Sequence, residues 1–103
     1  MLEEKKKYLK LYVLQETVIN RYINLSRLHP ENINQYKTKI KEAENLRFKI
    51  EESISAVDDP LLCELLNLKY VFGKTLEEIS LSLNYSKRHI ERLHIKALNK
   101  FEI

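Results

Sequence analysis

Turn-forming residues are scarce in this chain: its 103 residues include one glycine and two prolines. A β-sheet protein of this length needs glycine, proline and similar residues at each of many turns, whereas a few long helices need almost none. Hydrophobic residues make up 44% of the chain, enough to form a core and too many for a disordered segment. The sequence therefore predicts an all-α fold.

Residues 1–57 carry two long amphipathic patterns. In residues 2–28 and again in residues 32–57, apolar residues recur at steps of three and four, which is typical of helices with one apolar face. His29-Pro30 separates the two, because the residue before a proline is pushed out of the helical conformation. Long helices joined by a short connection pack antiparallel, so we expect a helical hairpin here.

Some residues of the hairpin need a partner beyond its apolar stripes. Arg47 interrupts the second stripe, and we expect it either to pair with Glu16 or to extend its stem into solvent. Four apolar residues lie outside the stripes: Leu9, Leu14, Leu46 and Phe48. A helix pair that is apolar on several sides favours packing against a second copy, so we expect a homodimer. The alternative is a seam that packs entirely within one chain.

Residues 58–103 predict three shorter helices. The first begins at Asp59-Pro60, where aspartate is a good N-cap and proline suits the first helical position. It ends at Gly73, a residue that adopts the left-handed conformation of a C-terminal cap. The second begins at the capping box Thr75 to Glu78. Ser86 caps the third, which runs to about Phe101.

The turn between the last two helices has the spacing of a helix-turn-helix. Such a motif needs a small residue at the helix crossing, a left-handed corner, and apolar anchors beneath the second helix. The sequence offers these in order as Ser80, Asn84, Ile90 and Leu93. The second helix also carries five basic residues against the single acidic Glu91, within a chain of net charge +3. A concentrated positive surface of this kind attracts polyanions.

The run from Leu65 to Phe101 resembles region 4 of sigma-70-type transcription initiation factors, over about 40 of the 103 residues. The matching positions are Leu68-Lys69-Tyr70, Gly73, Thr75 to Ile79, Ser86, and Lys96-Ala97-Leu98. The chain departs from the pattern at Asn84, where glycine is usual, and at Ile95, where a small residue is usual. Counterparts of the regions that read the −10 element or bind the polymerase clamp are missing. A region-4-like part after a small helical part is similar to phage and prophage late-gene regulators of the ArpU and RinA type.

This resemblance implies a sequence-specific transcriptional regulator, phage or prophage encoded, that binds double-stranded DNA with the helix at residues 87–101 in the major groove. By position in the family, the base-reading residues are Lys87, Arg88, Glu91 and Arg92. Arginine can bind guanine O6 and N7 together, and glutamate can accept from cytosine N4. Phosphate contacts are expected from Lys69, Lys74, Thr75, Ser86, His89, Lys96 and Lys100.

Other functional classes find less support in the sequence. Two alternatives remain: an adaptor that binds RNA polymerase, and a recognition subunit of a phage DNA-packaging complex. His89 and His94 are roughly 140° apart on a helix and cannot bind one metal ion together. The sequence has no Gly-rich phosphate loop and no carboxylate pair placed in an apolar pocket, and Cys63 has no evident base partner. We therefore expect no metal, no cofactor and no enzymatic activity.

The expected location is the cytoplasm. Cys63 is the only cysteine and lies among leucines, which is typical of a buried thiol in a reducing compartment. No apolar run approaches the ~18 residues of a membrane span, so we expect no membrane contact. The charged N-terminus lacks the apolar segment of a signal peptide.

Overall fold

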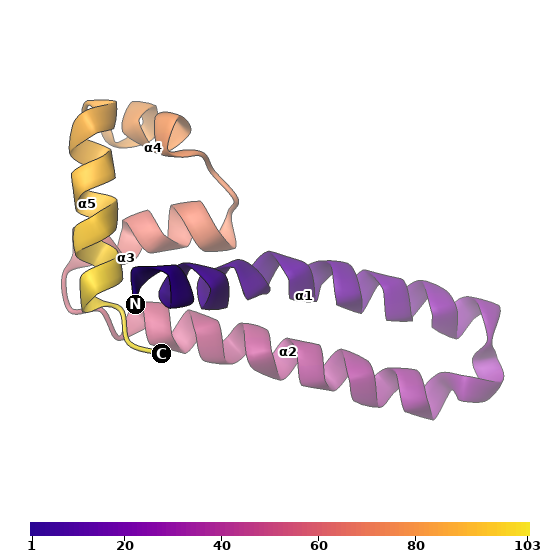
Figure 1. Cartoon of the computed structure of the whole chain (residues 1–103). Helices are drawn as coiled ribbons and strands as arrows, with labels where there is room; N and C mark the ends of the chain where they lie inside the picture. Colours follow the sequence, from indigo (N-terminus) through magenta and orange to yellow (C-terminus); the bar gives the residue numbers. More distant parts are fainter.

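The computed structural model describes residues 1–103 and contains helices but no strands, which confirms the predicted all-α fold. The elements are α1 (Leu2–Leu28), the short 3-10 helix η1 (Pro30–Asn32), α2 (Ile33–Ser55), α3 (Pro60–Leu66), the π-helical segment η2 (Asn67–Val71), α4 (Leu76–Leu83) and α5 (Lys87–Lys100) (Figure 1).

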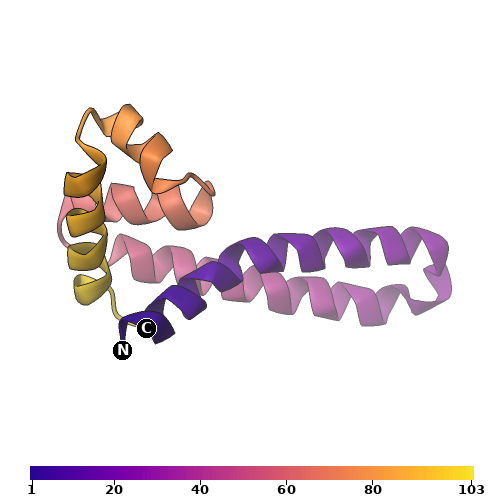
Figure 2. The ribbon, with the colours of Figure 1, turned by 45° about the horizontal axis from the view of Figure 1, so that its top comes forward.

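Helices α1 and α2 lie antiparallel and side by side, and η1 reverses the chain between them (Figures 1 and 2). The pair gives the molecule its elongated form, 52 × 25 × 21 Å. Ala43, Ile50 and Ile54 of α2 are buried in the seam, at positions that the periodic pattern predicts. Near the reversal, the rings of Tyr22 and Tyr36 pack with centroids 5.7 Å apart.

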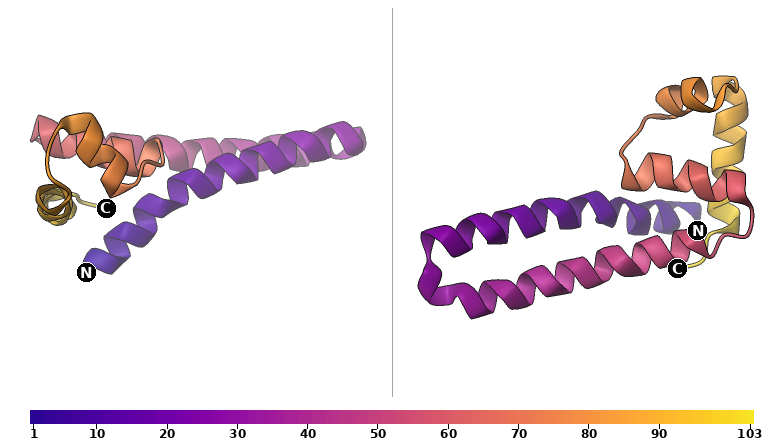
Figure 3. Two further views of the ribbon diagram at one scale, coloured as in Figure 1. Left: turned by 90° about the horizontal axis from the view of Figure 1, so that it is seen from above. Right: turned by 180° about the vertical axis from the view of Figure 1, so that it is seen from behind.

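The base of this hairpin shares its hydrophobic core with the C-terminal helices. The main core cluster takes residues from every α-helix except α4, and includes Leu9, Ile54, Leu66 and Phe101. Figure 3, in the view from above, shows the first turns of α1 leaving the line of α2 and passing toward α5. Lys5 Nζ donates to the carbonyl oxygen of Leu98 at 2.9 Å there. Residues 1–57 are therefore not a free-standing arm.

Two of the four hairpin residues that we expected to face a second copy are instead covered by this shared core. Leu9 is fully buried, and Leu46 is partly buried against the same cluster. The cause is the cover that α3 and α5 give to the base of the hairpin, which a helix-by-helix pattern does not reveal. Only Leu14 and Phe48 are exposed, by 52% and 59%.

Of the two alternatives expected for Arg47, the ion pair with Glu16 does not form. The guanidinium carbon of Arg47 lies 5.0 Å from the centre of the Tyr12 ring, and Nη2 lies 3.4 Å from the Tyr12 hydroxyl. That hydroxyl in turn donates to Glu51. The buried tyrosine offers both a ring face and a hydroxyl within the seam, so the guanidinium packs there.

The helix expected between Asp59 and Gly73 forms, with an unexpected change of geometry. Asp59 Oδ1 accepts from the N–H groups of Leu61 and Leu62 at 3.0 and 3.2 Å, which confirms the N-cap. Gly73 has φ 71°, which confirms the left-handed end. Between them, η2 widens the helix into a π-turn. The π-turn contains Tyr70, whose side chain is buried against the main core.

Candidate nucleic-acid interface

The caps that define the helix-turn-helix form as the sequence predicts. Thr75 Oγ1 accepts from the N–H of Glu78 at 3.1 Å, and Glu78 Oε1 accepts from the N–H of Thr75 at 3.0 Å. The backbone N–H of Thr75 holds the pKa of the Glu78 carboxyl below its ordinary value. Asn84 adopts the left-handed conformation (φ 61°, ψ 40°), and Ser86 Oγ accepts from the N–H of His89 at 3.1 Å. Short-range hydrogen bonds thus set the angle at which α5 leaves the turn.

A second core cluster anchors α5 from beneath. Leu65 of α3, Ile79 of α4 and Ile90 of α5 are fully buried against one another. Leu83 and Leu93 pack against this cluster and are partly buried. Ser80, the small residue predicted at the helix crossing, is buried, and its hydroxyl donates to the carbonyl oxygen of Glu77 at 2.7 Å. At Ile90 the N-terminal half of α5 is therefore held by α3 and α4.

The outward face of that half is free of cover. All four predicted base-reading residues are exposed, and we call them the α5 ridge: Lys87, Arg88, Glu91 and Arg92. None of them takes part in an ion pair. Figure 1 shows the first turns of α5 beside α4 and away from the hairpin, which approaches only the other end of α5. The geometry leaves room for a large partner along the ridge.

The predicted phosphate contacts divide into four places. Ser86, His89 and Lys96 accompany the ridge on α5, whereas Lys74 and Thr75 lie at the start of α4, the end remote from α5 (Figure 1). Lys69 and Lys100 lie apart from both groups. Each of these two lysines has a different set of neighbours.

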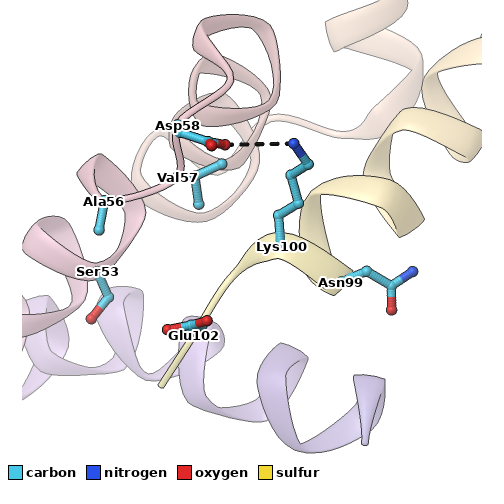
Figure 4. Close-up of a pocket in the computed structure, with 7 residues that line it drawn as sticks. All are labelled: Ser53, Ala56, Val57, Asp58, Asn99, Lys100 and Glu102. Carbon is cyan, nitrogen blue, oxygen red and sulfur yellow. Dashed lines mark hydrogen bonds and ion pairs between the residues drawn. The ribbon is translucent and has the colours of Figure 1, made fainter.

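Lys100 faces the base of the hairpin. Its Nζ lies 3.5 Å from Asp58 Oδ1, across a shallow hollow at the junction of α2 and α3 (Figure 4). The remaining lining residues are Ser53, Ala56, Val57, Asn99 and Glu102. In this position Lys100 ties the end of α5 to the α2–α3 connection.

Lys69 lies on η2 and is half-buried, with Nζ 5.6 Å from the centre of the Tyr70 ring. Burial lowers its pKa, and so do the positive charges of Lys10 and Lys6 on α1. The structure thus places Lys69 against the hairpin.

The two histidines of α5 have different surroundings. The ring of His89 packs edge-on against Tyr85 with centroids 4.9 Å apart, and its Nδ1 lies 3.3 Å from Nη2 of Arg92. His94 is buried, and its Nε2 is hydrogen-bonded to the Tyr70 hydroxyl at 2.7 Å. Burial, with the positive charges of Lys69 and Lys6, lowers the pKa of His94 to about 4. Burial also raises the pKa of Tyr70 to about 12, so the pair is neutral at pH 7.

The link between Tyr70 and His94 is absent from the sequence prediction. The two residues are 24 positions apart, and only the π-turn and the crossing of α3 by α5 bring them together. The sequence does contain one signal that His94 is buried. His94 lies seven residues after Lys87 and four before Leu98, so the three share one stripe of the helix, and the last residue of that stripe is apolar.

Comparison of the chain with protein-family models, with curated proteins and with solved structures found no match. The likeness to sigma region 4 therefore rests on the motif residues alone. No helix here combines the length and the apolar character that crossing a lipid bilayer requires.

Proposed function

We propose that this protein is a sequence-specific regulator of transcription that binds double-stranded DNA through α5. One observation carries the proposal. The α5 ridge is exposed and forms no ion pair, while the opposite face of the same turns is fully buried at Ile90. A rigidly held, cationic helix that projects from a helix-turn-helix fits the major groove, which admits one α-helix.

The ridge has side chains suited to reading base edges. Arg88 and Arg92 are four residues apart and so lie on one face, where each can bind a guanine through O6 and N7. Glu91 can accept a hydrogen bond from cytosine N4. Ile95, 51% exposed, continues the same stripe and can contact a thymine methyl group or a second subunit.

Other exposed groups on α5 would fix its register on the duplex. The capped start of α5 at Ser86 presents backbone N–H groups, and Lys96 adds a positive charge one turn beyond Arg92. Contacts of this kind bind phosphates without reading sequence. Because they displace counterions from DNA, they make affinity fall steeply with salt.

Selection of bound duplexes from a random pool tests the proposal. We expect an enriched motif, and loss of measurable specific binding in the double variant Arg88→Ala/Arg92→Ala. The matched control is Lys37→Ala/Lys41→Ala, which removes two exposed charges from the part of α2 farthest from α5. Absence of any enriched motif, together with no binding to duplex DNA at low salt, would contradict the proposal.

An adaptor that docks on RNA polymerase is the second candidate, and exposed apolar side chains favour it. Leu81 on α4 and Phe72 after η2 are 80% and 67% exposed, so each offers an apolar contact to a partner. A pull-down of polymerase that survives Arg88→Ala/Arg92→Ala but fails with Leu81→Ser would support this function. If both variants still capture polymerase, the result would argue against a specific site on α4.

We further propose that the protein is a phage or prophage regulator that acts in the cytoplasm as a homodimer on two half-sites. Leu14 and Phe48, however, do not form one patch. Phe48 follows Arg47, which packs over Tyr12, whereas Leu14 lies roughly 200° around α1 from Tyr12. Each is therefore a separate candidate contact. Sedimentation velocity at micromolar concentration should show a dimer, and a monomer alone would overturn this part.

A further inference from the structure

Three side chains connect the turn of the helix-turn-helix to the α5 ridge: Tyr85, His89 and Arg92. Tyr85 follows the left-handed corner at Asn84, and its backbone N–H donates to the carbonyl oxygen of Ser80 at 3.1 Å. The rings of Tyr85 and His89 pack edge to face, with centroids 4.9 Å apart and planes at 62°. His89 Nδ1 in turn lies 3.3 Å from Nη2 of Arg92. Direct contacts therefore link a base-reading residue to the turn.

The chemistry of the two partners fixes the direction of the hydrogen bond between His89 and Arg92. A guanidinium has several N–H groups and no acceptor, so Arg92 can only donate. Nδ1 of His89 must then offer a lone pair, and the proton of the neutral imidazole lies on Nε2. His89 thus holds the arginine through one ring nitrogen and keeps an N–H on the other, which can donate to a phosphate.

The His89 ring is a well-ordered acceptor, because other contacts hold it. The backbone N–H of His89 donates to Ser86 Oγ at 3.1 Å, and the side chain is partly buried. The contact with Tyr85 favours one ring orientation, since aromatic pairs attract at defined geometries. His89 and Arg92 are three residues apart and share a face of α5, so the guanidinium reaches Nδ1 while it stays exposed.

The two arginines of the α5 ridge differ in this respect. Arg88 forms no hydrogen bond and no ion pair, whereas one N–H of Arg92 is engaged by His89. The other N–H groups of Arg92 remain available for the O6 and N7 atoms of a guanine. A long side chain that is already held loses less rotamer freedom when it binds.

We infer that His89 is a positioning residue for DNA recognition, which holds the guanidinium of Arg92 in the orientation that reads a base edge. The inference rests on the proposed function and assigns to His89 a part in specificity that needs no contact with a base. The base preference of Arg92 therefore depends on His89, and the base preference of Arg88 does not.

The ¹⁵N relaxation of the arginine Nε–H groups in the free protein measures how firmly each guanidinium is held. We expect a higher order parameter for Arg92 than for Arg88. His89→Phe keeps an aromatic ring beside Tyr85 but removes the acceptor, so Arg92 should become as mobile as Arg88. His89→Asn should recover order at Arg92, because asparagine Oδ1 is as many bonds from Cβ as Nδ1 is. Equal order of the two arginines in the wild type would overturn the inference.

Selection of bound duplexes from a random pool measures the consequence for specificity. Arg88→Ala and Arg92→Ala first identify the base pair that each arginine reads. In His89→Phe the preference at the Arg92 base pair should fall by about twofold to tenfold, the range expected when one long side chain must be immobilised on binding. The preference at the Arg88 base pair is the internal control and should not change, and His89→Asn should stay closer to the wild type.

Base preference also separates this role from a phosphate contact of His89. Loss of a phosphate contact weakens binding to all sequences alike and leaves the preferred bases unchanged. If His89→Phe keeps the wild-type preference at both base pairs, or loses it at both, the inference is wrong although the function stands. If the wild-type protein binds no duplex even at low salt, the function fails, and the reading role of Arg92 fails with it.

Discussion

His94 carries the clearest pH dependence in the molecule. Its pKa of about 4 in the folded protein lies below the ordinary value of 6.5, because the buried ring is protonated only at the cost of desolvation and of repulsion from Lys69 and Lys6. Between these two values the unfolded chain binds a proton that the folded chain does not. Stability is therefore fully present above pH 6.5 and declines as the pH falls, by about 2 kcal/mol between pH 7 and pH 5.

Urea unfolding of the wild type and of His94→Gln at these two pH values measures the effect. Glutamine can still hydrogen-bond to Tyr70 but cannot titrate in this range, so the variant should lose clearly less stability on acidification. His29 and His89 are unchanged and serve as internal controls. Equal losses in both proteins would show that His94 is not the source.

For single residues, the capping hydrogen bonds could be predicted from the sequence, but the side-chain contacts between distant residues could not. The caps at Asp59, Thr75 and Ser86 use donors two or three residues away, so spacing alone identifies them. Arg47 had several possible partners across the seam, and the packing of Tyr12 decided between them. All four α5 ridge residues were predicted exposed and are so, whereas the neighbours of Lys69 and Lys100 depend on the tertiary fold.

Among the elements, the turn between α4 and α5 controls how the ridge is presented. Asn84 has φ 61°, a conformation that costs most residues with a Cβ roughly 1–2 kcal/mol and that asparagine tolerates better. We expect Asn84→Ala to destabilise the protein by about 1 kcal/mol and Asn84→Gly to be neutral or stabilising.

Thermal unfolding followed by circular dichroism would measure both variants of Asn84. Asn45→Ala, at an exposed position inside α2, is the control and should raise stability slightly, since alanine is the better helix former there. A change at Asn84 no larger than the change at Asn45 would mean that the left-handed corner is not required.

The π-turn of η2 is the element that the sequence could not foretell. Its apolar pattern is that of any buried helix, and Gly73 marks where the helix ends but not how its last turn is wound. The hydrogen bond of Tyr70 with His94 and the packing of Tyr70 in the main core favour the wider turn only after α1 and α5 are in place. Helix starts and ends are local properties, whereas this geometry is a consequence of packing.

For the whole molecule, the shared core predicts that the hairpin base and the helix-turn-helix unfold as one unit. Leu9 is fully buried in that core, so Leu9→Ala should cost about 2–5 kcal/mol. Leu14→Ala, on the same helix at a side chain that is 52% exposed, should cost far less. Chemical unfolding monitored by circular dichroism and by tyrosine fluorescence should give coincident transitions. Similar costs for the two variants would contradict the shared core.

The packing of the hairpin against the C-terminal helices could not be predicted from the sequence, and the reason lies in the start of α1. Leu2, Lys5 and Leu9 continue the stripe of Tyr12 and Ile19 back to the start of α1, but a lysine interrupts it there. A stripe that contains a lysine resembles a surface feature until the partner helix is known. Fold class and helix ends followed from periodicity and capping, while the packing between the two halves did not.

The most direct test of the central claim is a map of backbone amide shifts in the NMR spectrum as duplex DNA is added at low salt. The account predicts that residues 86–96 on α5 shift first and most, while the far end of the hairpin at residues 22–36 stays unchanged. Shifts confined to the hairpin, or none at all, would contradict a function based on α5.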